Sequence, residues 1–124
     1  MGQRDDGSIL VIEDDDAFRR VVTTILERQG FKVVAVRDFA AAIAVIESNQ
    51  PIALLLTDVG LPVGTPHGLS VAQMAKSRRP HLKVLYMSGS YDPEQIGAMI
   101  DGASFLAKPF RPEQLIKAVE TALV

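Results

Sequence analysis

The sequence predicts an α/β domain built on a doubly wound, parallel sheet. Short apolar runs recur along the chain, and each is followed by a segment with helical periodicity. The connections between these segments are short, which is typical of strands that alternate with covering helices on both faces of a sheet. In such open sheets the ligand crevice lies at the carboxyl ends of the strands. Functional residues are therefore expected where each apolar run stops.

The first third of the chain contains two strands around one helix. Residues 8–12 form a continuous apolar run, as expected of a strand buried on both faces. Residues 16–29 carry apolar side chains at helical spacing, and Gly30 follows at the position where glycine commonly ends a helix. Residues 32–36 then supply a second short strand.

The middle of the chain repeats the pattern. Residues 39–47 are alanine-rich and helical, with Asp38 as the expected N-cap. A third apolar run spans residues 52–57, and a helix is predicted near residues 68–79, ended by Pro80.

The last third contains two more strand–helix pairs. Residues 83–87 form the fourth strand, and Asp92 begins a helix with proline in its first turn. Residues 104–107 form a short fifth strand, and Pro112 opens the last helix.

The bulk properties exclude several classes of protein. The chain has 124 residues, 48% hydrophobic and 23% charged, which suits one globular domain over residues 8–124 behind a flexible polar leader at residues 1–7. There is no cysteine, so disulfide scaffolds, zinc–thiolate sites and thiol nucleophiles are excluded, and a reducing cytoplasm fits. No apolar run approaches the roughly 20 residues of a membrane helix.

The charge balance gives no footprint for nucleic acid. The formal net charge is −2. The only basic doublets are Arg19-Arg20 and Arg78-Arg79, and we expect both to lie on solvated helix faces.

Charged and polar residues gather at the predicted carboxyl ends of the strands. Glu13 and Asp14 follow the first strand, Asp58 the third, Ser88 the fourth and Lys108 the fifth. The first and third strands are neighbours in a doubly wound sheet, so their carboxylates should converge. Carboxylates about 5 Å apart repel by about 3 kcal/mol per pair at an effective dielectric near 20, so a positive group is needed. A hard divalent cation such as Mg²⁺ with oxygen ligands meets that need, and Lys108 adds to it.

This arrangement predicts phosphoryl chemistry at Asp58. With a cation in place, the carboxylate can act as a nucleophile and form an acyl phosphate. The cation, Lys108 and the Ser88 hydroxyl could then each meet one phosphoryl oxygen. Asp15 or Asp16 is expected instead to cap the first helix.

Four segments, VIEDD, LLTDVGLP, YMSGS and AKPF, stand in this order on successive strand ends. Together they resemble the receiver domain of bacterial two-component response regulators over almost the whole chain. The resemblance implies a flavodoxin-like (βα)5 fold with strand order 2-1-3-4-5. It also implies a phosphoprotein that takes a phosphoryl group from the phosphohistidine of a histidine kinase or histidine phosphotransferase and catalyses its own dephosphorylation. Such a protein is a signalling module rather than a turnover enzyme.

The resemblance also implies a role for each site residue. Asp58 is the expected phosphoacceptor, and Glu13, Asp14, Asp58 and the backbone carbonyl of Gly60 are the expected ligands of Mg²⁺, with Mn²⁺ as an alternative ion. Ser88 and Lys108 take the switch-hydroxyl and lysine positions, and the Lys108-Pro109 bond is expected to be cis. Phosphorylation would shift the face formed by the fourth helix, fifth strand and fifth helix toward a downstream protein partner, in a monomer or a phosphorylation-promoted dimer.

Three features depart from the family pattern. The acidic pair is Glu-Asp rather than Asp-Asp, and Phe105 stands where the switch aromatic residue is usually tyrosine, so any switch there must work by packing. The loop at residues 62–68 is longer than usual, which together with MSGSYD is similar to receivers of hybrid histidine kinases.

Competing functions fit less well. Phosphatases of the haloacid dehalogenase type and Toprim nucleases use a DxD pattern, whereas Asp58 is followed by Gly60. Flavodoxins carry a Ser/Thr-rich phosphate loop after the first strand, where this chain has acids. A receiver-like interaction module that is never phosphorylated remains the main alternative.

Overall fold

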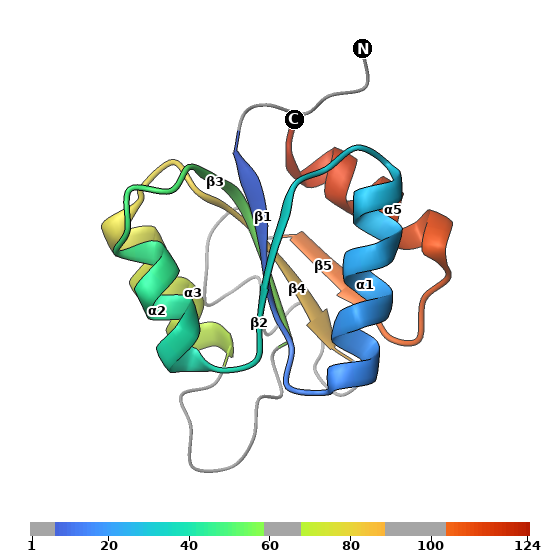
Figure 1. The fold of residues 1–124 in the computed structure, drawn as a ribbon. Helices are drawn as coiled ribbons and strands as arrows, with labels where there is room; N and C mark the ends of the chain where they lie inside the picture. The colour runs from blue at the N-terminus through green and yellow to red at the C-terminus, as the bar shows by residue number, and fades with distance from the viewer. Residues whose placement is uncertain (1–6, 59–67, 89–103) are drawn as a thin grey trace.

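The five strands form one parallel sheet in the order β2-β1-β3-β4-β5, with the first three strands out of sequence order as predicted (Figure 1). The computed structural model describes residues 7–58, 68–88 and 104–124. The strands are β1 Ser8–Ile12, β2 Val33–Val36, β3 Ile52–Asp58, β4 Lys83–Ser88 and β5 Ser104–Ala107. The helices in the described ranges are α1 Asp16–Arg28, α2 Phe39–Ile46, α3 Gly68–Arg78 and α5 Pro112–Ala122.

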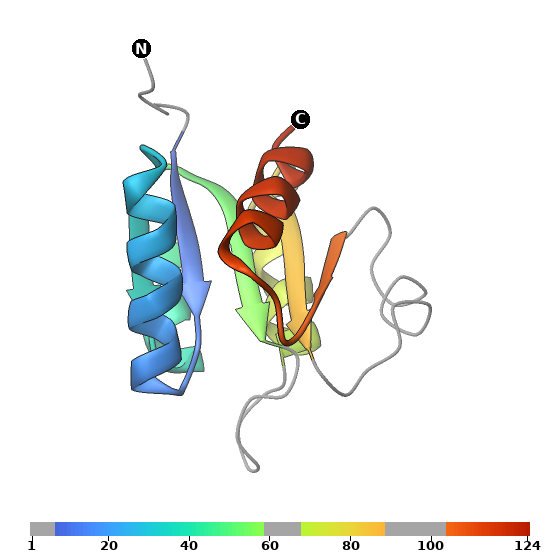
Figure 2. The ribbon, with the colours of Figure 1, turned by 90° about the vertical axis from the view of Figure 1, so that its right-hand side faces the viewer.

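Helices cover both faces of the sheet, which explains the continuous apolar runs. Helices α1 and α5 lie on one face, and α2 and α3 lie on the other (Figures 1 and 2). Along β3, Leu54 and Leu56 pack beneath α1 and α5, while Leu55 between them packs beneath α2 and α3. All three side chains are fully buried, as expected of a central strand that is covered on both faces.

The helix ends follow the sequence signals. Asp15 is the N-cap of α1, where its Oδ1 accepts the backbone N–H of Phe18 at 3.0 Å. Asp38 caps α2 in the same way, through a bond of 2.9 Å from the N–H of Ala41. After α1, Gly30 adopts φ of 89°, the left-handed conformation expected of a glycine that ends a helix.

Two strands run one residue further than predicted. Asp58 pairs with Met87, and Ser88 pairs with Ala107, so both polar residues are the last members of strands rather than the first members of loops. Their backbones are consequently held in the sheet. The helix predicted to begin at Asp92 and the loop at residues 62–68, apart from the start of α3 at Gly68, lie outside the described residues. None of the helices in the described ranges has the length and apolar character needed to cross a bilayer.

Candidate functional site

The site lies at the carboxyl edge of the sheet, where parallel strands bring their last residues together. Glu13 and Asp14 follow β1, Asp58 ends the neighbouring β3, Ser88 ends β4, and Lys108 follows β5. The order β1-β3-β4-β5 thus brings the predicted residues to adjacent strand ends. Gly60, the remaining predicted ligand, lies outside the residues that the structure describes.

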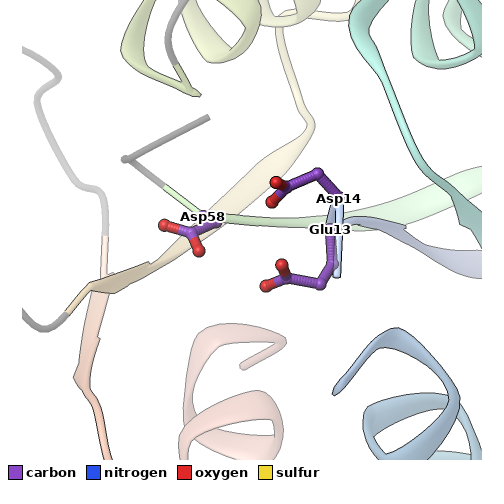
Figure 3. A group of neighbouring side chains, drawn as sticks. All are labelled: Glu13, Asp14 and Asp58. Carbon is purple, nitrogen blue, oxygen red and sulfur yellow. The ribbon is translucent and has the colours of Figure 1, made fainter. Parts of the chain in front are cut away.

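Three carboxylates converge at this edge. Glu13, Asp14 and Asp58 each offer one oxygen, and these oxygens lie within 4.8 Å of one another. Figure 3 shows the Glu13 and Asp14 side chains extending from the end of β1 toward Asp58. Glu13 is buried, Asp58 is half-buried and Asp14 is exposed, so solvent reaches the cluster at Asp14.

Lys108 supplies the positive charge that the carboxylates require. Its Nζ lies 2.6 Å from Oδ2 of Asp58 and 3.3 Å from Oε1 of Glu13. Its backbone N–H donates to the carbonyl of Ser88 at 3.0 Å, and the following bond to Pro109 is cis, as expected. Burial disfavours the ammonium, but the hydrogen bond and charge of Asp58, with the charge of Glu13, raise the pKa of Lys108. The lysine is therefore a permanent cation at neutral pH.

The Glu13 side chain is buried, and the net effect of its surroundings is to raise its pKa. Burial raises its pKa, whereas the N–H of Asp15, which donates to Oε2 at 3.1 Å, and the Lys108 ammonium lower it. Its backbone carbonyl accepts a bond of 3.0 Å from Arg19, whose other guanidinium nitrogen lies 2.7 Å from Asp16. The expectation that Arg19 lies on a solvated face is therefore wrong. Arg19 holds the turn that carries the acidic pair, while Arg20 is exposed as expected.

The predicted switch residues lie on adjacent strands. Ser88 is buried at the end of β4, and Phe105 is half-buried in β5 beside Tyr86. Phe105 packs against the core beneath α2 and α3, so its ring is positioned by packing, as its lack of a hydroxyl requires.

Tyr86 was not singled out by sequence reasoning. It is fully buried, and its hydroxyl has no hydrogen-bond partner among the described residues. Burial raises the pKa of this phenol, so the group stays neutral.

The sequence also did not indicate an aromatic pair, Phe18 and Phe110, beside Lys108. The Lys108 Nζ lies 4.5 Å from the centroid of the Phe18 ring, within cation–π range. The Phe18 ring is tilted by 57° against Phe110, with centroids 5.7 Å apart. Helical periodicity identified Phe18 only as part of the apolar stripe of α1, since a stripe does not reveal which cation lies above it.

The donor set suits a hard divalent cation. Three carboxylate oxygens from Glu13, Asp14 and Asp58 match the oxygen preference of Mg²⁺, which binds through one or two carboxylates and keeps several waters. The exposed side of Asp14 leaves space for those waters. Thiol and imidazole ligands are not among these residues, so softer transition metals fit less well.

Comparisons with known proteins agree with one another. The family model for the response regulator receiver domain matches residues 9–120. The chain is 30% identical to the response regulator receiver protein CpdR of Brucella abortus, covering 94% of this chain and 96% of that protein. It is 33% identical to nodulation protein W of Bradyrhizobium diazoefficiens, of which it spans only 50%. A solved response regulator receiver protein from Sinorhizobium medicae superimposes with a TM-score of 0.85 at 30% identity, covering 96% of this chain and 95% of that one.

Proposed function

The chain belongs to the response regulator receiver domain family, and from this premise we propose that it is a phospho-accepting receiver in two-component signal transduction, with Asp58 as the acceptor. The observation that carries the proposal is the contact of 2.6 Å between the Asp58 carboxylate and the Lys108 ammonium, inside a cluster of three acids. A carboxylate held by an ammonium at the end of a buried strand is positioned for nucleophilic attack.

The reaction transfers a phosphoryl group from a phosphohistidine to Asp58. An Asp58 oxygen attacks the phosphorus, the P–N bond breaks, and the imidazole leaves, giving an acyl phosphate. Lys108 already contacts Asp58, so its ammonium needs little movement to meet the transferred oxygens. Glu13, Asp14, Asp58 and the Gly60 carbonyl would hold Mg²⁺, which when bound neutralises charge on the phosphoryl oxygens. Attack of water on the phosphorus would break its bond to the Asp58 oxygen, release inorganic phosphate and return Asp58 to its free form.

The signal would leave the site through Ser88 and Phe105. An acyl phosphate brings about −1.5 to −2 charges to the end of β3, as other phosphorylated residues do. The Ser88 hydroxyl on the adjacent strand would turn toward these oxygens, and Phe105 would repack behind it. The change shifts an existing equilibrium of the face that includes β5 and α5, where a downstream protein would bind.

The cellular context follows from the same proposal. The donor would be a histidine kinase or histidine phosphotransferase in the cytoplasm, and the protein would act as a monomer or as a dimer promoted by phosphorylation. The chain spans half of nodulation protein W but almost all of CpdR, so stand-alone and multidomain settings both have precedents among its relatives.

Intact-mass analysis tests the chemistry directly. The protein is incubated with phosphoramidate or acetyl phosphate, with and without Mg²⁺, as wild type and as Asp58→Asn. We expect a Mg²⁺-dependent gain of one phosphoryl group in the wild type and none in the variant. Asp38→Asn is the matched control, because asparagine still caps α2 and this residue lies outside the acidic cluster. A wild type that gains no mass under any condition would favour the unphosphorylated interaction module instead.

A further inference from the structure

We propose that Phe18 is a positioning residue for Lys108: its ring holds the ammonium beside the acidic cluster while the carboxylates bind a cation and Asp58 is phosphorylated. The inference builds on the proposed function, because it concerns the lysine that would stabilise the transferred phosphoryl group. Among the residues that the structure describes, three groups lie against the Lys108 Nζ: Asp58 at 2.6 Å, Glu13 at 3.3 Å and the Phe18 ring centroid at 4.5 Å.

A lysine side chain benefits from a restraint on its ammonium more than an arginine side chain does. Its charge sits on a flexible four-carbon stem, and its three N–H donors carry no fixed orientation. Two of the three contacts described for the Lys108 ammonium are with carboxylates that also belong to the acidic cluster. A cation that binds Glu13 and Asp58 competes for those oxygens, and an acyl phosphate removes the charge of the Asp58 carboxylate.

The Phe18 contact is independent of that exchange. A ring neither ligates a hard cation nor accepts a phosphoryl group, and its negative face attracts an ammonium whether or not the carboxylates are engaged. Of the three described contacts, this one alone persists through the whole reaction. The ring therefore limits how far the ammonium can move when its carboxylate partners change.

Phe18 is itself held rigidly enough to serve as a support. Its backbone N–H is the group that Asp15 caps, at 3.0 Å, which fixes the first turn of α1 directly after the acidic pair. Its ring packs on Phe110, two residues beyond Lys108, at 5.7 Å between centroids. The same segment thus carries both the lysine and the aromatic neighbour that orients the ring.

Nuclear magnetic resonance gives the direct test, with Mg²⁺ alone as the probe. The Lys108 ε-methylene protons should resonate upfield of other lysines in the wild type because of the Phe18 ring current, and should stay upfield at saturating Mg²⁺. Phe18→Leu should abolish the upfield shift, and Phe18→Trp should keep it. A wild-type shift that disappears when Mg²⁺ binds would show that the ammonium leaves the ring, and would overturn the proposal.

Phosphorylation kinetics give the second readout. Replacing the ring by leucine should lower the initial rate with phosphoramidate about two- to ten-fold, the range that corresponds to one cation–π contact. Pentafluorophenylalanine at position 18 keeps the packing volume but removes the negative face, so it should lower the rate as leucine does. Phe18→Trp should restore the wild-type rate.

The controls separate packing from electrostatics and from the proposed function. Phe39→Leu removes another half-buried ring, on the opposite face of the sheet, and should leave the rate unchanged. A pentafluorophenylalanine protein with the wild-type rate would mean that Phe18 acts by packing alone, and the inference would fail. If the wild type is not phosphorylated at all, the proposed function fails, while the ring-current measurement still decides where the ammonium lies.

Discussion

Replacing Arg79 with alanine should destabilise the domain far more than the same change at its neighbour Arg78. Arg79 follows the end of α3 and is half-buried, and its guanidinium reaches across to the end of α2. Arg78 is exposed and contacts only the Glu47 carboxylate, at 3.1 Å, among the interactions described for it. The guanidinium of Arg79 donates to the carbonyls of Gln50 at 2.7 Å, Ser48 at 2.8 Å, Ile46 at 3.1 Å and Val45 at 3.3 Å.

The expected loss of stability in Arg79→Ala depends on which of these carbonyls water can reach once the guanidinium is removed. Val45 and Ile46 belong to the last turn of α2, and both bonds from Arg79 to their carbonyls are partly buried. The Val45 carbonyl also accepts from the N–H and hydroxyl of Ser48, at 3.1 and 2.6 Å, whereas Arg79 is the only partner described for the Ile46 carbonyl. The bonds to Ser48 and Gln50 are exposed, so water replaces them at little cost. Two partly buried hydrogen bonds from a charged donor contribute about 2–3 kcal/mol together.

The exposed ion pair of Arg78 contributes much less. Its side chain is 57% exposed and that of Glu47 is 44% exposed, so solvent screens the pair and its loss costs about 0.5 kcal/mol or less. Arg79→Lys keeps the charge but loses the fork of five donors, and should recover less than half of the loss.

Urea unfolding followed by circular dichroism measures both variants against the wild type. The unfolding free energy should fall by about 2–3 kcal/mol for Arg79→Ala and by about 0.5 kcal/mol or less for Arg78→Ala, with an unchanged dependence on urea. Amide exchange at the end of α2 should accelerate in the first variant only. Equal losses of stability in the two variants would refute the assignment of Arg79 as the group that closes the end of α2.

Two further predictions concern buried groups near the site. Burial raises the pKa of Glu13 above its ordinary value of 4.5. Between the two pKa values, the native state therefore holds a proton that the unfolded state has lost. The contribution of Glu13 to the unfolding free energy falls as pH rises from the ordinary pKa through the raised one. Glutamine at position 13 does not titrate. In metal-free buffer, the unfolding free energy of Glu13→Gln minus that of the wild type should therefore increase from pH 4.5 toward neutrality. A difference that stays constant over this pH range would contradict the reasoning. Tyr86→Phe removes a buried hydroxyl without a partner among the described residues and should stabilise the protein by about 1 kcal/mol, measured by urea unfolding. A loss of stability would mean that this hydroxyl has a partner in the remainder of the chain.

The fold and the acidic site could be predicted because both depend on position along the chain. A strand buried on both faces is predominantly apolar, so the change from the leucines at 54–56 to Asp58 marks the end of β3 without reference to any other strand. Parallel pairing then brings Asp58 to the same edge as Glu13 and Lys108, and their convergence follows from topology alone.

The two basic doublets show why the remainder could not be predicted. Arg19 and Arg20 are neighbours within α1, where successive side chains point about 100° apart, so one can face the protein while the other faces solvent. Arg78 is the last residue of α3, and Arg79 lies beyond it, where its guanidinium reaches the end of α2. Arg20 and Arg78 are exposed as expected, whereas Arg19 and Arg79 donate to backbone carbonyls. Every residue type has a backbone carbonyl, so no pattern of side chains in the sequence indicates which carbonyls these two arginines bind.

The cation–π contact between Phe18 and Lys108 combines both kinds of information. Periodicity places Phe18 on the inner face of α1, and topology places Lys108 at the end of β5, but neither locates the ring relative to the ammonium. That relation depends on how α1 sits over the sheet, which is set by the packing of its core side chains Val22 and Leu26. The residues that bear the chemistry can therefore be read from strand ends, while the residues that orient them emerge only once the helices are packed.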